Sequence, residues 1–289
     1  MKLPRPLLLL LLLGLAGAGT ALGQASAFDP DPARGPREGS TWHFIKSNRD
    51  SSKPWSLVMH VVAPQQIEVI KSSGSTSYVE VHALVDLERA LPTHLQQWNL
   101  RCGERQPTNT VLVRPMPEGG TQFELRPAGG APRHFAAGPA AHVWGFDLGA
   151  FPLIAPRLRH RAAFQLGMVD LNQPDGSGGF KQAPLRFVPV ETETLGAQPA
   201  LRYRLESPLF DGKQGDVWLS PEGELLKAEH ELLTSRDWRD WKLERVRSEH
   251  LPRAEWERFK LDLQRRTARA QIEMPGCQGT PPVTPAIRP

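Results

Sequence analysis

Apolar and polar side chains alternate along much of this chain, and this period-two pattern limits the possible folds more than any other feature. In the most regular segment, Leu201, Tyr203 and Leu205 alternate with charged residues. Residues 55–61 and 79–85 repeat the pattern. A strand of this kind buries one face and exposes the other, as strands of antiparallel sheets commonly do. We therefore expect a mainly β protein built on an antiparallel sheet.

The segment from Asp216 to His230 predicts a β-hairpin. Two strand-like runs flank the sequence Ser-Pro-Glu-Gly at residues 220–223. Pro221 restricts one backbone dihedral of the turn, and Gly223 can adopt the positive φ that closes it. We expect two antiparallel strands joined at this turn.

One segment near the C-terminus has a helical period instead. Residues 252–272 contain no glycine, and Trp256, Phe259 and Leu263 recur at helical spacing. Arg253, Arg258, Arg265, Arg266 and Arg269 lie mostly around the other sides of the helix axis. This pattern predicts an amphipathic helix at about 252–272 that packs its apolar stripe on the sheet.

The N-terminus has the three parts of a secretory signal. Lys2 and Arg5 precede the apolar run Leu7–Leu13, and small residues follow it. The run is shorter than the roughly 20 apolar residues that cross a bilayer. We expect a bacterial-type signal peptide at 1–23, with cleavage after Ala27 as a second possibility, and export to the periplasm. An uncleaved anchor is the alternative, and no second apolar stretch predicts a transmembrane segment after signal removal.

Composition divides the rest of the chain. Residues 24–40 include a run rich in proline, glycine and charge, which predicts a flexible linker. Residues 41–272 form one predicted β-rich domain, because a chain of this length suits a single large β domain. Residues 273–289 are rich in proline and predict a tail held by its cysteine.

Cys102 and Cys277 are the two cysteines of the chain. In an oxidising compartment, a pair of cysteines most simply forms a disulfide. Two free thiols are the alternative. A catalytic cysteine is disfavoured because the sequence has no Cys-x-x-Cys motif.

Charge gives no reason to expect nucleic-acid binding. The formal net charge of +4 falls to +2 when Lys2 and Arg5 leave with the signal peptide. A nearly balanced chain lacks the excess of cations that neutralises phosphates.

No motif of catalysis, of metal binding or of cofactor binding is present. His60 and His82 lie in predicted strands and can face each other, but a metal site needs three or four convergent ligands. Residues 170–179 have the composition of a calcium loop, yet Asp175 stands where the EF-hand requires glycine. We therefore predict no catalytic residue, no metal and no cofactor.

Eight tryptophans accompany only two tyrosines. Tryptophan often lines binding clefts, although large apolar residues also simply fill cores. The candidate ligand-binding residues are Trp55, Trp144, Trp218, Trp256 and Phe259.

Basic residues concentrate between Arg236 and Arg269, where eleven cations face seven acids. A basic strand and helix can meet anionic headgroups or an acidic partner, whereas the interleaved acids suit an ordinary solvated face. The candidate residues for a headgroup or partner surface are Arg258, Arg265, Arg266 and Arg269.

Four strand and turn motifs carry a family resemblance: Val188–Glu191, Gly196–Tyr203, Asp216–Gly223 and Leu226–Glu229. Over about residues 187–246 they resemble the closing strands of a bacterial exported family of unknown function. That family is similar in fold to the lipoprotein carriers LolA and LolB. The resemblance implies a half-barrel, with helical or loop material over its concave side and an apolar cavity between them. It implies no catalytic residues, and this chain shows one clear helix where a carrier lid has several.

Together these observations predict a curved antiparallel sheet with a C-terminal amphipathic helix. The leading functional hypothesis is a non-enzymatic periplasmic binding or carrier-like protein for a hydrophobic ligand, either a lipid or a lipid-modified partner such as a lipoprotein. The alternative is a cell-envelope module for protein interaction or structure, with a filled core. A hydrolase whose site is assembled from distant residues is a third possibility.

Overall fold

Strands dominate the described part of the chain, as the alternation predicts. The computed structural model describes residues 31–117, 120–138, 141–144, 149–158, 162–174, 176, 179–210, 212–230 and 240–277. The predicted signal peptide, the first part of the predicted linker and most of the predicted tail lie outside these residues. The predicted fold class, a mainly β protein with a curved antiparallel sheet and a C-terminal helix, is confirmed.

Fifteen strands belong to one sheet. The first eight are β1 (Ser40–Asn48), β2 (Trp55–Ala63), β3 (Gln66–Ser73), β4 (Ser77–Asp86), β5 (Leu91–Arg101), β6 (Glu104–Pro115), β7 (Thr121–Pro127) and β8 (Arg133–Ala137). The others are β9 (Ala141–Trp144), β10 (Phe164–Pro174), β11 (Phe180–Leu195), β12 (Gln198–Glu206), β13 (Gly215–Leu219), β14 (Leu225–His230) and β15 (Trp241–His250).

Helical segments are few. Among the described residues, the α-helices are α2 (Phe151–Ile154) and α3 (Arg253–Ile272), and the 3-10 helices are η1 (Pro32–Arg34), η2 (Ala155–Arg157), η3 (Pro208–Phe210) and η4 (Pro275–Cys277). The long helix α3 matches the predicted helix closely. Within the described residues, no helix combines the length and the apolar composition that crossing a bilayer requires.

The order of the strands forces the sheet to curl. β1 to β8 lie side by side in chain order, β15 pairs with β1, and β14 to β9 continue in reverse order. The two edges of the sheet are therefore β8 and β9, which follow each other in the chain. The four residue steps from Ala137 to Ala141 span at most about 14 Å, so the edges must approach each other at this point. All pairings are antiparallel except that of β9 with β10.

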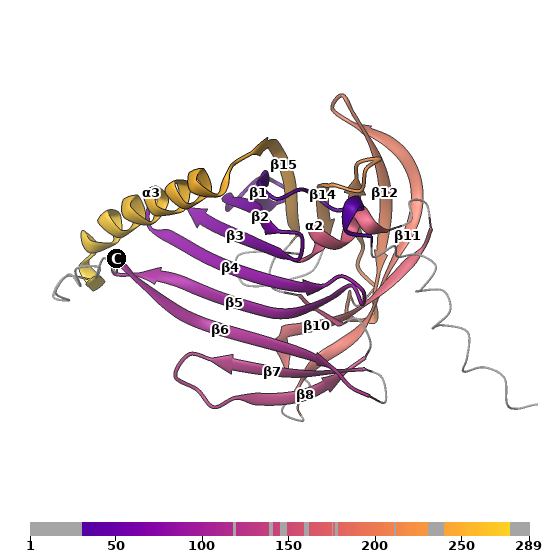
Figure 1. The fold of residues 1–289 in the computed structure, drawn as a ribbon, viewed down its shortest axis with the longest axis horizontal. Coiled ribbons are helices and arrows are strands. Elements are labelled where there is room, and N and C mark those ends of the chain that lie inside the picture. The colour runs from indigo at the N-terminus through magenta and orange to yellow at the C-terminus, as the bar shows by residue number, and fades with distance from the viewer. Residues whose placement is uncertain are drawn as a thin grey trace, which may run out of the picture.

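One face of the sheet is turned inward. Leu57 and Met59 of β2 share an apolar cluster with Val81 of β4, and also with Val217 of β13 and Leu243 of β15. Because residues of both halves of the sheet meet in this cluster, it lies on the concave side. Figure 1 shows the two halves, β1–β8 and β10–β14, curling toward each other.

The short helix α2 lies between the two halves (Figure 1). Phe151, Leu153 and Ile154 are buried within the same apolar cluster. The ring of Phe151 stacks on Phe187 of β11, with 5.5 Å between the ring centroids. A helix of one turn thus occupies part of the concave side.

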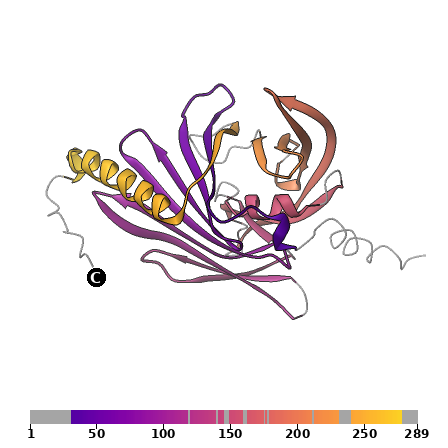
Figure 2. The ribbon, with the colours of Figure 1, turned by 45° about the horizontal axis from the view of Figure 1, so that its top comes forward.

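The long helix α3 packs on the opposite, convex face. A second apolar cluster joins Trp256 to Val58, Ile70, Tyr78 and Leu100, one residue from each of β2 to β5. Figures 1 and 2 show α3 running across these strands at the end of the sheet farthest from β10–β14. The prediction that the helix packs on the sheet is confirmed. The helical material that the resemblance implies over the concave side is not this helix, because the strands turn their larger apolar face away from it.

The predicted hairpin is confirmed. β13 and β14 are antiparallel, and Ser220 and Glu224 close the turn between them with a 2.8 Å backbone hydrogen bond. Gly223 has φ +86°, the left-handed conformation that its lack of a Cβ permits.

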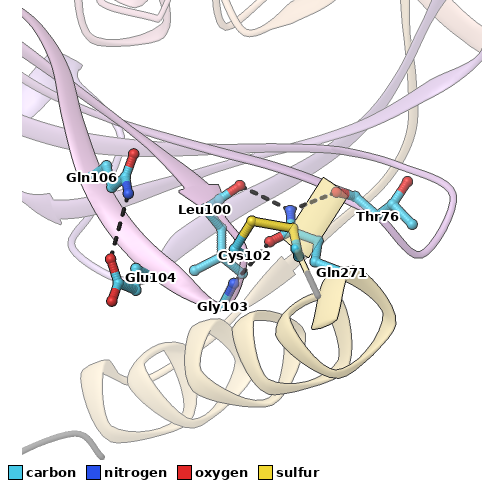
Figure 3. The surroundings of a disulfide bond; sticks show 8 residues. Thr76, Leu100, Cys102, Gly103, Glu104, Gln106 and Gln271 are labelled. Carbon is cyan, nitrogen blue, oxygen red and sulfur yellow. Dashed lines mark hydrogen bonds between the residues drawn. A yellow bond between two sulfur atoms is a disulfide. The ribbon is translucent and has the colours of Figure 1, made fainter. Parts of the chain in front are cut away.

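A disulfide joins Cys102 to Cys277, as predicted. It connects the turn between β5 and β6 to the chain just beyond α3 (Figure 3). Gln271 reinforces this connection: its Nε2 donates to the carbonyl oxygens of Thr76 and Leu100 at 2.7 and 2.8 Å, and its Oε1 accepts the amide hydrogen of Gly103 at 3.2 Å. The C-terminal end of α3 is therefore attached to two turns of the sheet.

Replacing both cysteines by serine, Cys102→Ser with Cys277→Ser, is expected to destabilise the protein. The bridged positions are 175 residues apart, and loop-closure entropy gives such a bridge up to about 5 kcal/mol. Urea unfolding followed by circular dichroism measures the change. Wild-type protein in reductant should match the double variant, and equal stability of oxidised wild type and variant would contradict the prediction.

Candidate functional site

The predicted ligand-binding residues do not gather in one place. Trp256 and Phe259 lie between α3 and the convex face of the sheet, with ring centroids 5.5 Å apart. Trp218 lies in a separate small cluster with Ala200. Trp55 is half-buried at the start of β2, and the side chain of Trp144 lies outside the described residues.

Two other tryptophans occupy the concave interior instead. Trp42 of β1 and Trp241 of β15 are buried in the main apolar cluster. In the sequence, Trp42 and Phe44 are two positions apart, as are Trp241 and Leu243, so each pair shares one face of its strand. The period-two pattern therefore predicts that both tryptophans lie on an apolar strand face. It does not predict that this face is the concave one.

The interior is bounded on one side by side chains rather than by a backbone ladder. Among the described strands, β8 pairs only with β7. Its Phe135 contacts Phe180 of β11, with 5.3 Å between the ring centroids, and the guanidinium of Arg133 lies 4.4 Å from the centroid of that same ring. Gln182 of β11 donates from Nε2 to the carbonyl oxygen of Ala136 at 2.8 Å. We call these five residues the side-chain seam.

A second candidate site lies under α3, where two carboxylates are buried on the convex face. Trp256 Nε1 and Lys260 Nζ both donate to Glu68 Oε2, each at 2.7 Å. Glu80 Oε1 accepts a hydrogen bond from His82 Nε2 at 2.7 Å, and Glu80 Oε2 accepts one from Arg105 Nε at 3.0 Å. These four polar partners leave both carboxylates well paired, as buried charges require.

The next turn of α3 adds a further contact to the same cluster. Gln264 Nε2 donates to the hydroxyl oxygen of Tyr78 at 3.0 Å and to Glu80 Oε2 at 3.3 Å. Residues 256, 260 and 264 of α3, four apart, therefore face the carboxylates along one line of the helix. Burial and the neighbouring carboxylate of Glu80 raise the pKa of Tyr78, so its hydroxyl stays protonated.

The two predicted strand histidines lie on the same face but do not meet. In the strand register, His60 is opposite Glu68, and Glu68 is opposite His82. The Thr41 hydroxyl donates to the Gly39 carbonyl at 3.0 Å, so it accepts a hydrogen bond from His60 Nδ1 at 2.8 Å. The His60 ring also stacks on Trp256, with 4.4 Å between centroids.

Ionisation of the cluster follows from burial and pairing. Burial lowers the pKa of His60 to about 4. Burial alone raises the pKa of Glu80, but the hydrogen bond from His82 and the charge of Arg105 outweigh it and lower that pKa to about 2. The pKa of Glu68 is also lowered, because the charge of His82 and the hydrogen bond from Lys260 outweigh its burial.

Glu68, Glu80 and His82 form a group of potential metal ligands that the sequence did not indicate. One ligand atom of each lies within 4.8 Å of the others. However, Lys260 Nζ is 2.7 Å from Glu68 and 3.9 Å from Glu80, and Arg105 also contacts Glu80. These two cations already balance the two carboxylates and would repel a divalent ion. These side chains therefore suit an ion-pair network that holds α3 on the sheet. They suit a metal centre less well.

The four arginines predicted for a headgroup or partner surface all lie on the exposed side of α3. Arg258, Arg265, Arg266 and Arg269 are exposed, and the last three border a surface groove of 480 Å³ together with Asp262. Sequence spacing alone placed these four residues on one side of the helix. Their accessibility follows from the burial of the opposite side against the sheet.

Comparisons with known proteins give a weak likeness of fold. No protein-family model matches the sequence, and no curated protein matches it. A β-barrel-like protein of the domain of unknown function DUF1849 from Brucella abortus is 8% identical, with a TM-score of 0.43, and the match covers 75% of this chain and 99% of that one. A Bacteroides fragilis protein, described as exported and of YmcC-like fold, is 14% identical with a TM-score of 0.29, covering 77% and 99%. These values assign neither family nor function, and the resemblance to LolA and LolB stays a prediction.

Replacing Lys260 by methionine is expected to lower the free energy of unfolding by about 3 kcal/mol, because it leaves the buried Glu68 without its cation. Arg258→Met is the matched control on the exposed side of the same helix and should change stability little. Adding Glu68→Gln to Lys260→Met should recover part of the loss. Chemical denaturation measures all three, and equal effects of the Lys260 and Arg258 variants would contradict the assignment.

Acid is expected to destabilise the fold in two steps. Between pH 6.5 and about 4 the unfolded chain protonates His60 while the folded chain does not, so stability falls as the pH falls. Glu80 adds a second loss between pH 4.5 and about 2, where only the unfolded chain takes up the proton. Denaturation curves of wild type and His60→Gln across the first window test this. The variant should lose less stability, by up to about 3 kcal/mol, and parallel curves would contradict the prediction.

Proposed function

We propose that this chain is an exported, non-enzymatic binding protein that takes up an apolar ligand, such as an acyl chain, on the concave side of its sheet. The observation that carries the proposal is the side-chain seam, Arg133, Phe135, Ala136, Phe180 and Gln182, where the described strands meet without a backbone ladder. Ring contacts and one side-chain hydrogen bond are weaker than a continuous ladder, so the seam is a place where the curled sheet can open.

The chemistry behind the seam suits an apolar ligand. Phe123 stacks on Phe135 with 5.1 Å between centroids, and Phe164 stacks on Phe187 at 4.2 Å. α2 contributes Phe151 and its neighbours to the same cluster without belonging to the sheet. A ligand that replaces α2 would bury its acyl chain against aromatic and aliphatic side chains, at about 0.8 kcal/mol for each buried methylene.

Export to the periplasm is part of the same proposal. Its support is the N-terminal pattern of Lys2, Arg5 and the apolar run Leu7–Leu13. The disulfide between Cys102 and Cys277 suits an oxidising compartment. A binding role without catalysis agrees with the pairing of both buried carboxylates under α3, which leaves them engaged in structural contacts.

A second candidate function is a cell-envelope module for protein interaction. The observation in its favour is the dense packing of the concave side, where Leu153, Ile154 and Ala155 are completely buried against the sheet. On this view α2 is a permanent part of the core, and partners would bind the outer surface.

Weakening the seam is expected to speed ligand uptake. Delipidated protein is mixed with a fluorescent fatty acid, and the rate of fluorescence increase is measured. Arg133→Gln with Gln182→Ala should raise that rate about tenfold, because one cation–π contact and one hydrogen bond are lost. The matched control, Gln122→Ala with Arg126→Gln, alters exposed positions of β7 and should leave the rate unchanged.

Native mass spectrometry of protein purified from the periplasm, before and after organic extraction, separates the two candidate functions. A stoichiometric lipid that extraction removes supports the carrier. An unliganded mass, together with no uptake of the fatty acid by any variant, overturns the carrier proposal in favour of the interaction module.

A further inference from the structure

The outward side of α3 presents a row of arginines. Arg258, Asp262, Arg265 and Arg269 follow a spacing of three or four residues, so they lie along one line of the helix, and Arg266 lies beside it. We call these five residues the arginine face. It carries four positive charges and one negative charge. Asp262 lies 3.8 Å from Arg265, and both side chains are 68% exposed, so such a pair is weak.

The arginine face has a shape suited to anionic groups. Arg265, Arg266, Arg269 and Asp262 border the groove of 480 Å³. Guanidinium groups bind phosphate oxygens through paired hydrogen bonds, and three of them around one groove can hold a phosphate from several sides. An exposed lysine cluster would supply charge without this geometry.

Apolar side chains border the same face. Leu261 is 43% exposed and Ile272 is 48% exposed, and because they are eleven residues apart they lie on the same border of the helix. Met274, just beyond the helix, is 44% exposed. A helix with a basic face and apolar side chains at its border is typical of proteins that bind at a lipid–water interface.

The helix is held in place while this side stays exposed. Its inner side is anchored through Trp256 and Lys260 to Glu68, and its C-terminal end through Gln271 and the disulfide of Cys277. Binding at the outer side therefore requires no ordering of the helix, and the cost of ordering a flexible segment is absent.

We propose that the arginine face docks the protein on a membrane surface of anionic phospholipids, with phosphate groups in the groove and Leu261, Ile272 and Met274 at the interface. The charge of the face is complementary to such a surface, and the apolar border favours a membrane over an acidic protein as the partner. This docking does not depend on a ligand inside the sheet.

Vesicle co-sedimentation of the full mature protein tests the proposal. Vesicles of phosphatidylcholine mixed with phosphatidylglycerol should bind the protein, and vesicles of phosphatidylcholine alone should not. Replacing Arg265, Arg266 and Arg269 by glutamine should weaken binding about 100-fold, and Leu261→Ser should weaken it further. High salt should also weaken it, because the attraction is between exposed charges.

Matched controls keep the test specific. Arg186→Gln with Arg204→Gln removes exposed arginines from β11 and β12 and should leave vesicle binding intact. Equal loss in this control, no preference for phosphatidylglycerol, or stronger binding to polyglutamate than to vesicles would each overturn the proposal. The triple variant should still take up a fatty acid in solution, so failure of membrane docking and failure of the binding function are measured separately.

Discussion

The fold depends on one topological constraint: the two edge strands of the sheet, β8 and β9, are consecutive in the chain. Only a strongly curled sheet brings its two edges within reach of so short a connection. Curling gives every strand a concave and a convex face, and the apolar residues of both halves meet on the concave side. The short helix α2 completes that interior, which leaves α3 to cover part of the convex face.

The carboxylates under α3 explain why this helix sits where it does. An apolar interface would tolerate a helix shifted along the strands, since hydrophobic contacts have little directionality. Glu68 and Glu80, once buried, accept only a helix that supplies donors at positions 256, 260 and 264. The polar cluster thereby selects the register of α3, and the disulfide holds its far end. The orientation of the arginine face toward solvent follows from that register.

The molecule therefore has two candidate binding surfaces. The concave interior, bounded by the side-chain seam, is lined by buried apolar side chains. The convex side carries the arginine face on a helix that the protein has fixed in place. A binding protein of the envelope needs both a place for its ligand and a means of approaching the membrane, and the two proposals assign these tasks to opposite faces of one sheet.

The sequence by itself determined the local structure: the alternating strands, the turn at Ser220–Gly223, and α3 with its separate apolar and basic sides. Each is encoded by residues close together in the chain, through backbone preferences and side-chain periodicity. It also indicated the disulfide, because only one pair of cysteines exists. Only the tertiary structure decided which strand face is concave, and therefore that Trp42 and Trp241 are inside while Trp256 is under α3. The physical reason is that this choice rests on contacts between distant residues, such as Glu68 with Lys260, which no local pattern records.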